Sequence, residues 1–388
     1  MNFEKHSLEN KEKIYLNTSV YDESKRRIKE LLPNYDNILI MFTGGKDCTV
    51  VLYLVEECLN EMGLKKPINI NYFDEELIPK EEMEFVNRLK ETGKYNILHY
   101  CLPFKTNIQI LNKKTEFIFW DKKRKKEWFR EPPKDAITQI NNKDVIINDY
   151  TIDTQIKIAM NFLKGSIIAF GGHRADESNL AYRNIMNSKR PYIASSFSNR
   201  VVKSKPIYDW STKDVFLYLK KNNKDYNRIY NHLVWCGLPL RNSLPINDNG
   251  LKQIEIYKQY DSDYYNHMIK LLPNLEVTAR YTNDLSFDKI TKKYGHTLNG
   301  IIKYIKENYD EQNQKDKLKQ IRRMIVKRNS NIKKTNIPLG SVPLRRIYMH
   351  LLYGLELDAI NPKHYLVEDF LFEGYTEEDY ENFMESYK

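Results

Sequence analysis

Short apolar runs that alternate with helix-period stretches restrict the fold of this chain more than any other feature. Residues 38–42, 68–73 and 97–102 are nearly continuous apolar runs, and residues 166–170 and 201–203 are two further strand candidates. Continuous apolar runs are typical of strands that are buried on both faces. The chain is therefore expected to contain a sheet whose two faces are both covered.

Helical candidates fill the segments between these runs. Val51, Leu54 and Cys58 share one face at helical spacing, and residues 80–89 and 150–163 form two further candidates. An order of strand, helix, strand, helix implies right-handed crossovers between parallel strands. We therefore predict a doubly wound parallel α/β sheet.

The second half of the chain has a different character. Strand signals fade after about residue 281, where helical periodicity dominates, and residues 315–334 are strongly basic while residues 368–385 are acidic. We predict an α/β domain over residues 1–240 with an inserted segment at about 103–150, followed by a mostly helical C-terminal region over residues 241–388.

The composition restricts the partners and the compartment. The 388 residues include 62 Lys and Arg against 52 Asp and Glu, and this net charge of +10 favours an acidic partner such as a nucleotide or a nucleic acid, although an AT-rich genome would produce the same excess of lysine. Because no run of about 18 apolar residues occurs and the N-terminus lacks an apolar signal core, we expect a cytoplasmic chain with no membrane partner. The four cysteines form no C-x-x-C pair, which disfavours a zinc site and an iron–sulfur cluster.

A buried strand runs directly into a glycine turn and a helix in the segment I-L-I-M-F-T-G-G-K-D-C-T, residues 38–49. Gly44 and Gly45 permit positive φ and close approach of a ligand to the backbone. The unpaired N–H groups at the start of a helix form an anion site, to which Thr43 adds a hydroxyl and Lys46 a cation. Asp47 can cap the helix or help to hold a metal. The segment predicts a phosphate site, and the alternative is an ordinary Gly-Gly turn of an α/β fold.

This loop resembles the PP-loop signature S-G-G-K-D-S of ATP pyrophosphatases and phosphoadenosine-phosphosulfate (PAPS) reductases. Thr43 stands for the first serine and keeps its hydroxyl, whereas Cys48 stands for the last and is a weaker donor. The resemblance implies that the loop holds the phosphates or the sulfate of an adenine nucleotide, ATP or PAPS. The residues so implied are Thr43, Gly44, Gly45, Lys46, Asp47 and Cys48, with catalytic roles for Lys46 and Asp47.

Two further segments agree with this resemblance. Asp74 and Glu76 follow the second predicted strand, where ligands of parallel sheets bind, and they suit a ribose hydroxyl, an adenine amine or, for Asp74 together with Asp47, Mg²⁺. The alternative is that these acids only cap a helix. Arg174 and Arg183 follow the fourth strand in a segment similar to the R-x-x-E-S…R segment of PAPS reductases, which implies two anion contacts and a catalytic role for Arg174.

Other segments resemble a narrower group, the PAPS-reductase-like proteins typified by the immunoglobulin-binding regulator IbrA. These segments are residues 101–103, 120–132, 237–241 and 343–347. The resemblance implies a further anion contact at Arg241, a ParB-like protein partner, and either PAPS sulfotransferase activity or a co-activator role. The chain lacks the C-terminal E-C-G-x-H cysteine of PAPS reductases, so reduction of PAPS is not expected. For the last cysteine, Cys236, we expect a buried apolar position rather than a nucleophile.

Two basic segments suggest further partners. The first is the run Lys122, Lys123, Arg124, Lys125 and Lys126, which lies between Trp120 and Trp128 and suits DNA or RNA, a lid over the nucleotide, or merely a solvated loop. The second contains Arg322 and Arg323 and suits a nucleic acid or an acidic surface. The sequence therefore predicts a nucleotide hydrolase or transferase that cleaves ATP or PAPS, or moves its adenylyl or sulfuryl group. The alternative is a non-catalytic nucleotide sensor or DNA-binding co-activator.

Overall fold

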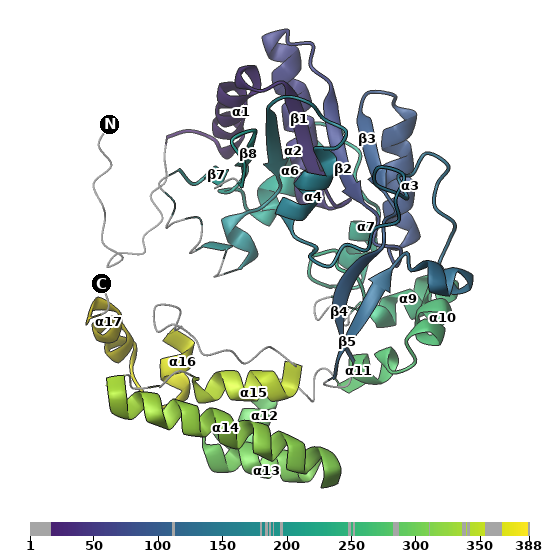
Figure 1. Cartoon of the computed structure of the whole chain (residues 1–388). Coiled ribbons are helices and arrows are strands. Elements are labelled where there is room, and N and C mark those ends of the chain that lie inside the picture. The colour runs from purple at the N-terminus through teal and green to yellow at the C-terminus, as the bar shows by residue number, and fades with distance from the viewer. Residues whose placement is uncertain are drawn as a thin grey trace. The chain divides into compact units, whose positions relative to one another are not determined.

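In the computed structural model the chain forms two compact units, Met1–Thr106 with Ile118–Asn242, and Asn107–Phe117 with Ser243–Lys388 (Figure 1). The description below covers residues 17–110, 113–178, 181–182, 185, 188, 190–194, 197–246, 250, 253–281, 287–309, 311–335, 339, 342–353 and 367–386. Each unit is described by itself.

A mostly parallel sheet forms the centre of the first unit. Its strands lie in the order β3 (Asn96–Tyr100), β2 (Ile68–Phe73), β1 (Asn37–Phe42), β6 (Ile167–Gly171), β8 (Val201–Ser204) and β7 (Ile193–Ala194). All neighbouring pairs are parallel except β7 and β8. Ile40 is opposite Ile70 on one side and Phe170 on the other, and all three side chains are buried. The five predicted strands are thus confirmed to within two residues at each end.

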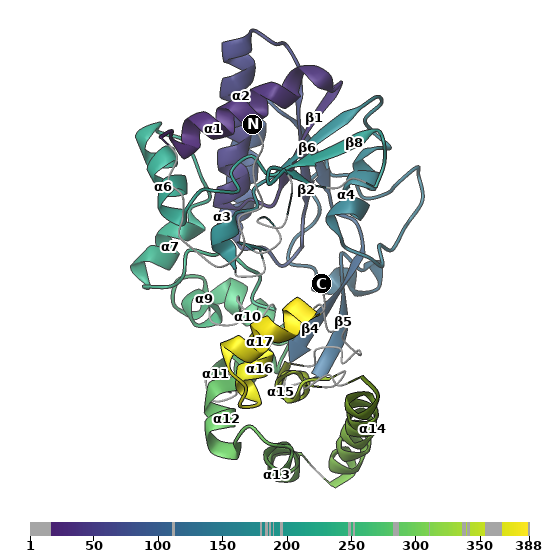
Figure 2. The same ribbon diagram turned by 90° about the vertical axis from the view of Figure 1, so that its left-hand side faces the viewer.

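Helices cover both faces of this sheet, as the apolar runs predict. The helices of the first unit are α1 (Val20–Leu31), α2 (Lys46–Met62), α3 (Lys80–Glu91), α4 (Ile152–Ala159), α6 (Thr212–Lys221) and α7 (Ile229–Trp235). Short 3₁₀ turns are η1 (Leu32–Asn34), η2 (Lys122–Glu127) and η3 (Ala175–Glu177). Figure 2 shows α1, α2 and α6 on one face and α4 on the other, which confirms the doubly wound fold.

The strand order creates a switch point between β1 and β6. From β1 the chain adds β2 and then β3 outward on one side, and it then returns to add β6 and β8 on the other side of β1. The crossovers after β1 and after β6 therefore diverge at the carboxyl ends of these two strands. In open α/β sheets this is the place where ligands bind.

The inserted segment contains a hairpin that the sequence analysis did not predict. Strands β4 (Phe104–Ile110) and β5 (Lys113–Phe119) form a separate two-stranded sheet. Phe104 and Phe119 are both buried at the open end of this hairpin, with ring centroids 4.6 Å apart. The insertion is therefore a structured element and not only a loop.

The second unit is helical in its C-terminal part, as predicted. Its helices are α9 (Ile254–Tyr260), α10 (Ser262–Leu271), α11 (Leu275–Tyr281), α12 (Phe287–Tyr294), α13 (Leu298–Asn308), α14 (Glu311–Thr335), α15 (Leu344–Tyr353), α16 (Val367–Phe372) and α17 (Glu377–Ser386). Ile301, Ile305 and Tyr348 belong to a buried core that α12, α13, α14, α15 and α16 share. None of the described helices combines the length and the apolar character that a bilayer crossing needs.

Candidate functional site

The glycine turn lies at the carboxyl end of β1, where it leads into α2. Gly45 is the N-cap of α2, and it makes no side-chain cap hydrogen bond to the first N–H groups of this helix. In the part of the chain that the structure describes, the hydroxyl of Tyr230 accepts a hydrogen bond from the N–H of Lys46 at 3.0 Å. The hydroxyl-bearing Thr43 is exposed at the mouth of the turn. This is the geometry of an anion site at a helix N-terminus.

Glu82 and Asn227 pack closely against the glycine turn. Gly44 has a φ of +67°, and a Cβ added to it would lie 2.6 Å from Cγ of Glu82 on α3. The carbonyl oxygen of Gly44 accepts a hydrogen bond from the amide of Asn227 at 3.2 Å. Only glycine fits this position without strain, because a left-handed backbone and a close neighbour coincide there. The prediction that glycine permits a special backbone conformation holds at Gly44, while Gly45 has a φ of −80°.

Cys48 braces the turn from within. Its Sγ accepts a hydrogen bond from the backbone N–H of Thr43 at 3.4 Å and donates one to the carbonyl of Gly45 at 3.0 Å. Burial raises the pKa of this thiol to about 11, so it stays protonated at neutral pH. The thiol therefore acts on the backbone of the loop, and its environment is not that of a nucleophile.

Lys46, Asp47 and Arg174 form one chain of charges across the switch point. Nζ of Lys46 lies 2.9 Å from one carboxylate oxygen of Asp47, and Nε of Arg174 lies 2.8 Å from the other. Both cations are almost completely buried, with 6% and 3% of their side chains exposed, whereas Asp47 is 18% exposed. The loop after β1 and the loop after β6 thus meet at a single carboxylate.

The hydrogen bonds of Arg174 and the absence of a side chain at Gly172 allow the loop after β6 to approach α2 closely. The guanidinium also donates to the carbonyl of Trp210 and to the hydroxyl of Thr212, both at 3.2 Å, and to the carboxylate of Asp176 at 3.1 Å. A Cβ on Gly172 would lie 2.6 Å from a backbone nitrogen at the start of α2, so this glycine permits the contact. Every hydrogen-bonding nitrogen of Arg174 has a partner, which fixes the direction of its charge.

Asp74 and Glu76, predicted as nucleotide contacts, lie in a second cluster that the insertion covers. Both side chains are fully buried. Asp74 pairs with Arg130 and with His99, and Glu76 pairs with Arg124. Burial opposes ionisation of Asp74, but the charge of Arg130 and the hydrogen bond from His99 outweigh it and hold the pKa of the carboxyl below its usual value.

Other side chains already contact both carboxylates that were predicted to hold Mg²⁺, Asp47 and Asp74. The oxygens of Asp47 face Lys46 and Arg174, as described. Those of Asp74 face Arg130 and His99, and the nearby thiol of Cys101 completes a compact group of potential ligands. Guanidinium and ammonium groups neutralise both carboxylates in this structure, and Mg²⁺ binding by Asp47 and Asp74 stays a prediction.

Of the remaining predicted residues, Arg183 lies outside the described residues. Arg241 is exposed after α7, and Arg322 and Arg323 are exposed on α14. In the basic run four lysines are exposed, namely Lys122, Lys123, Lys125 and Lys126, but Arg124 turns inward to Glu76. The expectation of a buried Cys236 is wrong, because this cysteine is exposed at the end of α7 beside Trp235, which is 77% exposed.

Three residues of the site escaped the sequence analysis: Glu82, Asn227 and Tyr230. Glu82 accepts hydrogen bonds from the hydroxyl of Tyr72 at 3.0 Å and the amide of Asn242 at 2.9 Å. Burial, and next the charge of Glu75, raise the pKa of Glu82 to about 8. No motif marks these residues, because each reaches the loop only through the fold.

Comparison with known proteins found a matching family model and a related protein. The model of the phosphoadenosine phosphosulfate reductase domain matches residues 37–234, which is just over half of the chain. An Escherichia coli (strain K12) protein described as "Uncharacterized protein YbdN" is 26% identical over 241 residues, and the match covers 59% of this chain and 58% of that protein. The match thus spans less than two thirds of the relative. Membership of the narrower IbrA-like group stays a prediction.

Two solved structures show weaker similarity. The FMN adenylyltransferase of Candida glabrata, in complex with FAD and inorganic pyrophosphate, is 14% identical with a TM-score of 0.35, over 55% of this chain and 60% of that chain. The phosphoadenylyl-sulfate reductase of Candida auris, in complex with phosphate, is 12% identical with a TM-score of 0.31, over 54% of this chain and 84% of that chain.

Proposed function

The chain belongs to the phosphoadenosine phosphosulfate reductase domain family, and we propose that it binds an adenine nucleotide, ATP or PAPS, at the turn formed by Thr43, Gly44, Gly45 and Lys46. The bound nucleotide is cleaved at its α-phosphate, or its adenylyl or sulfuryl group is transferred. One observation carries the proposal above the others. Lys46 and Arg174 come from the ends of two different strands and converge on Asp47 beside uncapped helical N–H groups.

Asp47 occupies the place of an anion in this proposal. A buried cation without a counter-charge is costly, and Asp47 supplies that counter-charge for Lys46 and Arg174 when the loop holds no ligand. An entering phosphate or sulfate shares these two cations with the carboxylate and accepts hydrogen bonds from the N–H groups of α2. Binding then exchanges one anionic partner for another, and no charge has to be buried alone.

The same groups suit the chemical step. The oxygen of an acceptor hydroxyl or of water forms a bond to the α-phosphorus, or to sulfur in PAPS, and gives up its proton to the solvent, while the bond from that atom to the oxygen of the leaving group breaks. The electron pair of that bond moves to the leaving group, whose growing negative charge faces Lys46 and Arg174. Cys48 takes no part as nucleophile, because its thiol is buried, protonated and bonded to the carbonyl of Gly45.

Calorimetric titration with ATP and Mg²⁺, PAPS and adenosine 3′,5′-bisphosphate tests this proposal. We expect one nucleotide to bind with micromolar affinity and Lys46→Ala to weaken it by about 10- to 100-fold, which is the effect of one charge-assisted hydrogen bond. Arg174→Lys keeps the charge but loses the guanidinium fork, so a loss of similar size is expected. The control is Lys65→Ala, which alters an exposed lysine of the same unit. Unchanged affinity in both loop variants would refute the proposal.

A second candidate function rests on the exposed lysines of η2. Lys122, Lys123, Lys125 and Lys126 are exposed in one short segment, which suits the phosphates of DNA or RNA. Replacing all four by glutamine should abolish salt-dependent binding of a DNA fragment without changing nucleotide affinity. No binding at low salt by the unmodified protein would leave the predicted ParB-like partner as the only version of a regulatory role.

A further inference from the structure

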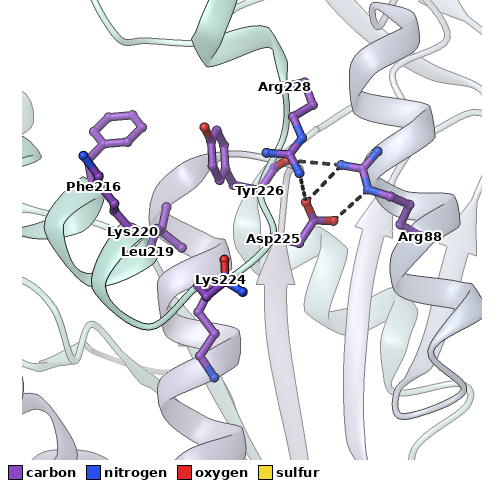
Figure 3. Close-up of a pocket in the computed structure, with 9 residues that line it drawn as sticks. Arg88, Phe216, Leu219, Lys220, Lys224, Asp225, Tyr226 and Arg228 are labelled. Carbon is purple, nitrogen blue, oxygen red and sulfur yellow. Dashed lines mark hydrogen bonds and ion pairs between the residues drawn. The ribbon is translucent and has the colours of Figure 1, made fainter.

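A basic cavity lies among α3, α6 and the segment that leads into α7. Its volume is about 680 Å³, within the usual range of small-molecule sites. The buried Leu219 of α6 contributes to its lining, and Phe216 and Tyr226 add two aromatic rings. Figure 3 shows Arg88 and Phe216 on opposite sides, with Tyr226 between them. None of the residues predicted for the phosphate loop belongs to this lining.

The charge of the cavity is unbalanced. Four cationic side chains line it, namely Arg88, Lys220, Lys224 and Arg228, and one carboxylate, Asp225, accompanies them. Lys224 pairs with Glu57 outside the lining at 3.2 Å, so Arg88, Arg228 and Lys220 remain against Asp225. Asp225 accepts a hydrogen bond from Nε of Arg88 at 2.7 Å and one from Arg228 at 2.9 Å, so two guanidiniums share a single carboxylate (Figure 3). Lys220 is exposed and has no ion-pair partner within the described part of the chain. The cavity therefore has donors and positive charge in excess of its internal anion.

The aromatic rings are held in place beside these donors. The ring of Phe216 packs edge-on against Tyr230 with centroids 5.6 Å apart. The guanidinium of Arg228 lies 4.8 Å from the centroid of the Tyr226 ring, and the hydroxyl of Tyr226 donates to Asn231 at 2.8 Å. Flat guanidinium and aromatic surfaces are those on which nucleobases stack.

We propose that this cavity binds a phosphate joined to a planar ring, the chemistry shared by a free nucleotide and by one nucleotide of a single strand. The phosphate faces Arg88 and Arg228 and competes with Asp225 for the guanidiniums. The ring packs against Tyr226 and Phe216, on the side of the cavity where Lys220 adds positive charge. The site is additional to the phosphate loop, although the segment that carries it continues directly to Asn227 and Tyr230, which hold that loop.

Titration of the Lys46→Ala protein tests the cavity separately from the phosphate loop. The probes are thymidine 5′-monophosphate and a fluorescein-labelled oligothymidylate, with thymidine and inorganic phosphate as partial ligands. We expect one of the two probes to bind, and each partial ligand to bind more weakly. Saturation by the mononucleotide identifies a free nucleotide as the ligand, and binding of the oligonucleotide alone identifies a single strand.

Two variants should change the affinity of the cavity in opposite directions. Lys220→Glu reverses the charge of an exposed lysine and should lower the affinity for the bound probe about fivefold. Asp225→Asn removes the internal competitor and should strengthen the same probe by about as much. Circular dichroism confirms that both variants are folded. Absence of probe binding in Lys46→Ala and Asp225→Asn alike, or affinity that neither cavity variant changes, would overturn the proposal. If nucleotide binding at the loop fails while these effects are found, only the proposed function is lost.

Discussion

Replacing Gly44 by alanine tests how the phosphate loop is supported. A Cβ at Gly44 would lie 2.6 Å from Cγ and 2.8 Å from Cδ of Glu82, and the backbone there has a φ of +67°. Gly63, at the other end of α2, has a φ of +64° and nothing within 4 Å of an added Cβ. The two glycines therefore share the backbone strain that alanine would suffer and differ only in the crowding.

The expected magnitudes follow from this difference. Alanine in the left-handed region is destabilising by about 1–2 kcal/mol at either position. At Gly44 the buried Glu82 must also move, although Tyr72 and Asn242 hold its carboxyl group. Overpacking of this kind costs about 1–3 kcal/mol more. We expect the free energy of unfolding to fall by about 1 kcal/mol in Gly63→Ala and by about 3 kcal/mol in Gly44→Ala.

Urea unfolding followed by tryptophan fluorescence measures both values. The four tryptophans all lie in the first unit, at positions 120, 128, 210 and 235, so the signal reports on the unit that contains the loop. Glu82→Ala removes the two crowding carbon atoms. In that background Gly44→Ala should therefore cost no more than Gly63→Ala does in the unmodified protein. An equal cost of Gly44→Ala in both backgrounds would contradict the role of Glu82 as the support of the loop.

Three further predictions concern single side chains. Arg124→Ala leaves the buried carboxylate of Glu76 without its cation and should lower the free energy of unfolding by about 3 kcal/mol, whereas the exposed neighbour Lys126→Ala should change it by less than about 0.5 kcal/mol in the same urea assay. The pKa of Glu82 is raised to about 8 in the folded protein, so the folded protein keeps a proton that the unfolded chain releases near the ordinary pKa of a glutamate. The free energy of unfolding should therefore fall as the pH rises from about 5 to 8. Glu82→Gln should flatten this fall, as measured by urea midpoints across that pH range. Cys48→Ser supplies another small donor for the same brace and should leave nucleotide affinity within about threefold by calorimetry, and a much larger loss would show that the thiol has a role beyond bracing.

The sheet could be predicted because its strands are buried on both faces. Residues 68–73 form an uninterrupted buried strand, and the predicted range coincides with β2. The hairpin of the insertion was missed although Phe104, Thr106 and Ile108 alternate with polar residues, the pattern of a strand with one buried face. The long distance between buried strands predicts an inserted segment, but a period-two signal in so short a stretch does not by itself specify a hairpin.

Some residues of the candidate site are close to the loop in the sequence and could be predicted, whereas others are distant in the sequence and could not. Lys46 and Asp47 were predicted because the turn and the helix that hold them are contiguous in the sequence. Asn227 and Tyr230 lie more than 180 residues away, and only the path of the chain after α6 brings them to the loop. Arg124 looked like one of five equivalent surface cations, and nothing in the run distinguishes the one whose partner is buried.

Asp47 and Asp74, the two acids singled out by resemblance to the family, lie in different surroundings. Asp47 faces two almost completely buried cations at the switch point and itself remains partly exposed. Asp74 faces Arg130 in a fully buried cluster beneath the insertion, where breaking the pair would leave a charge without solvent. The proposed exchange of anionic partners on ligand binding therefore suits Asp47, whereas a nucleotide contact by Asp74 stays a prediction.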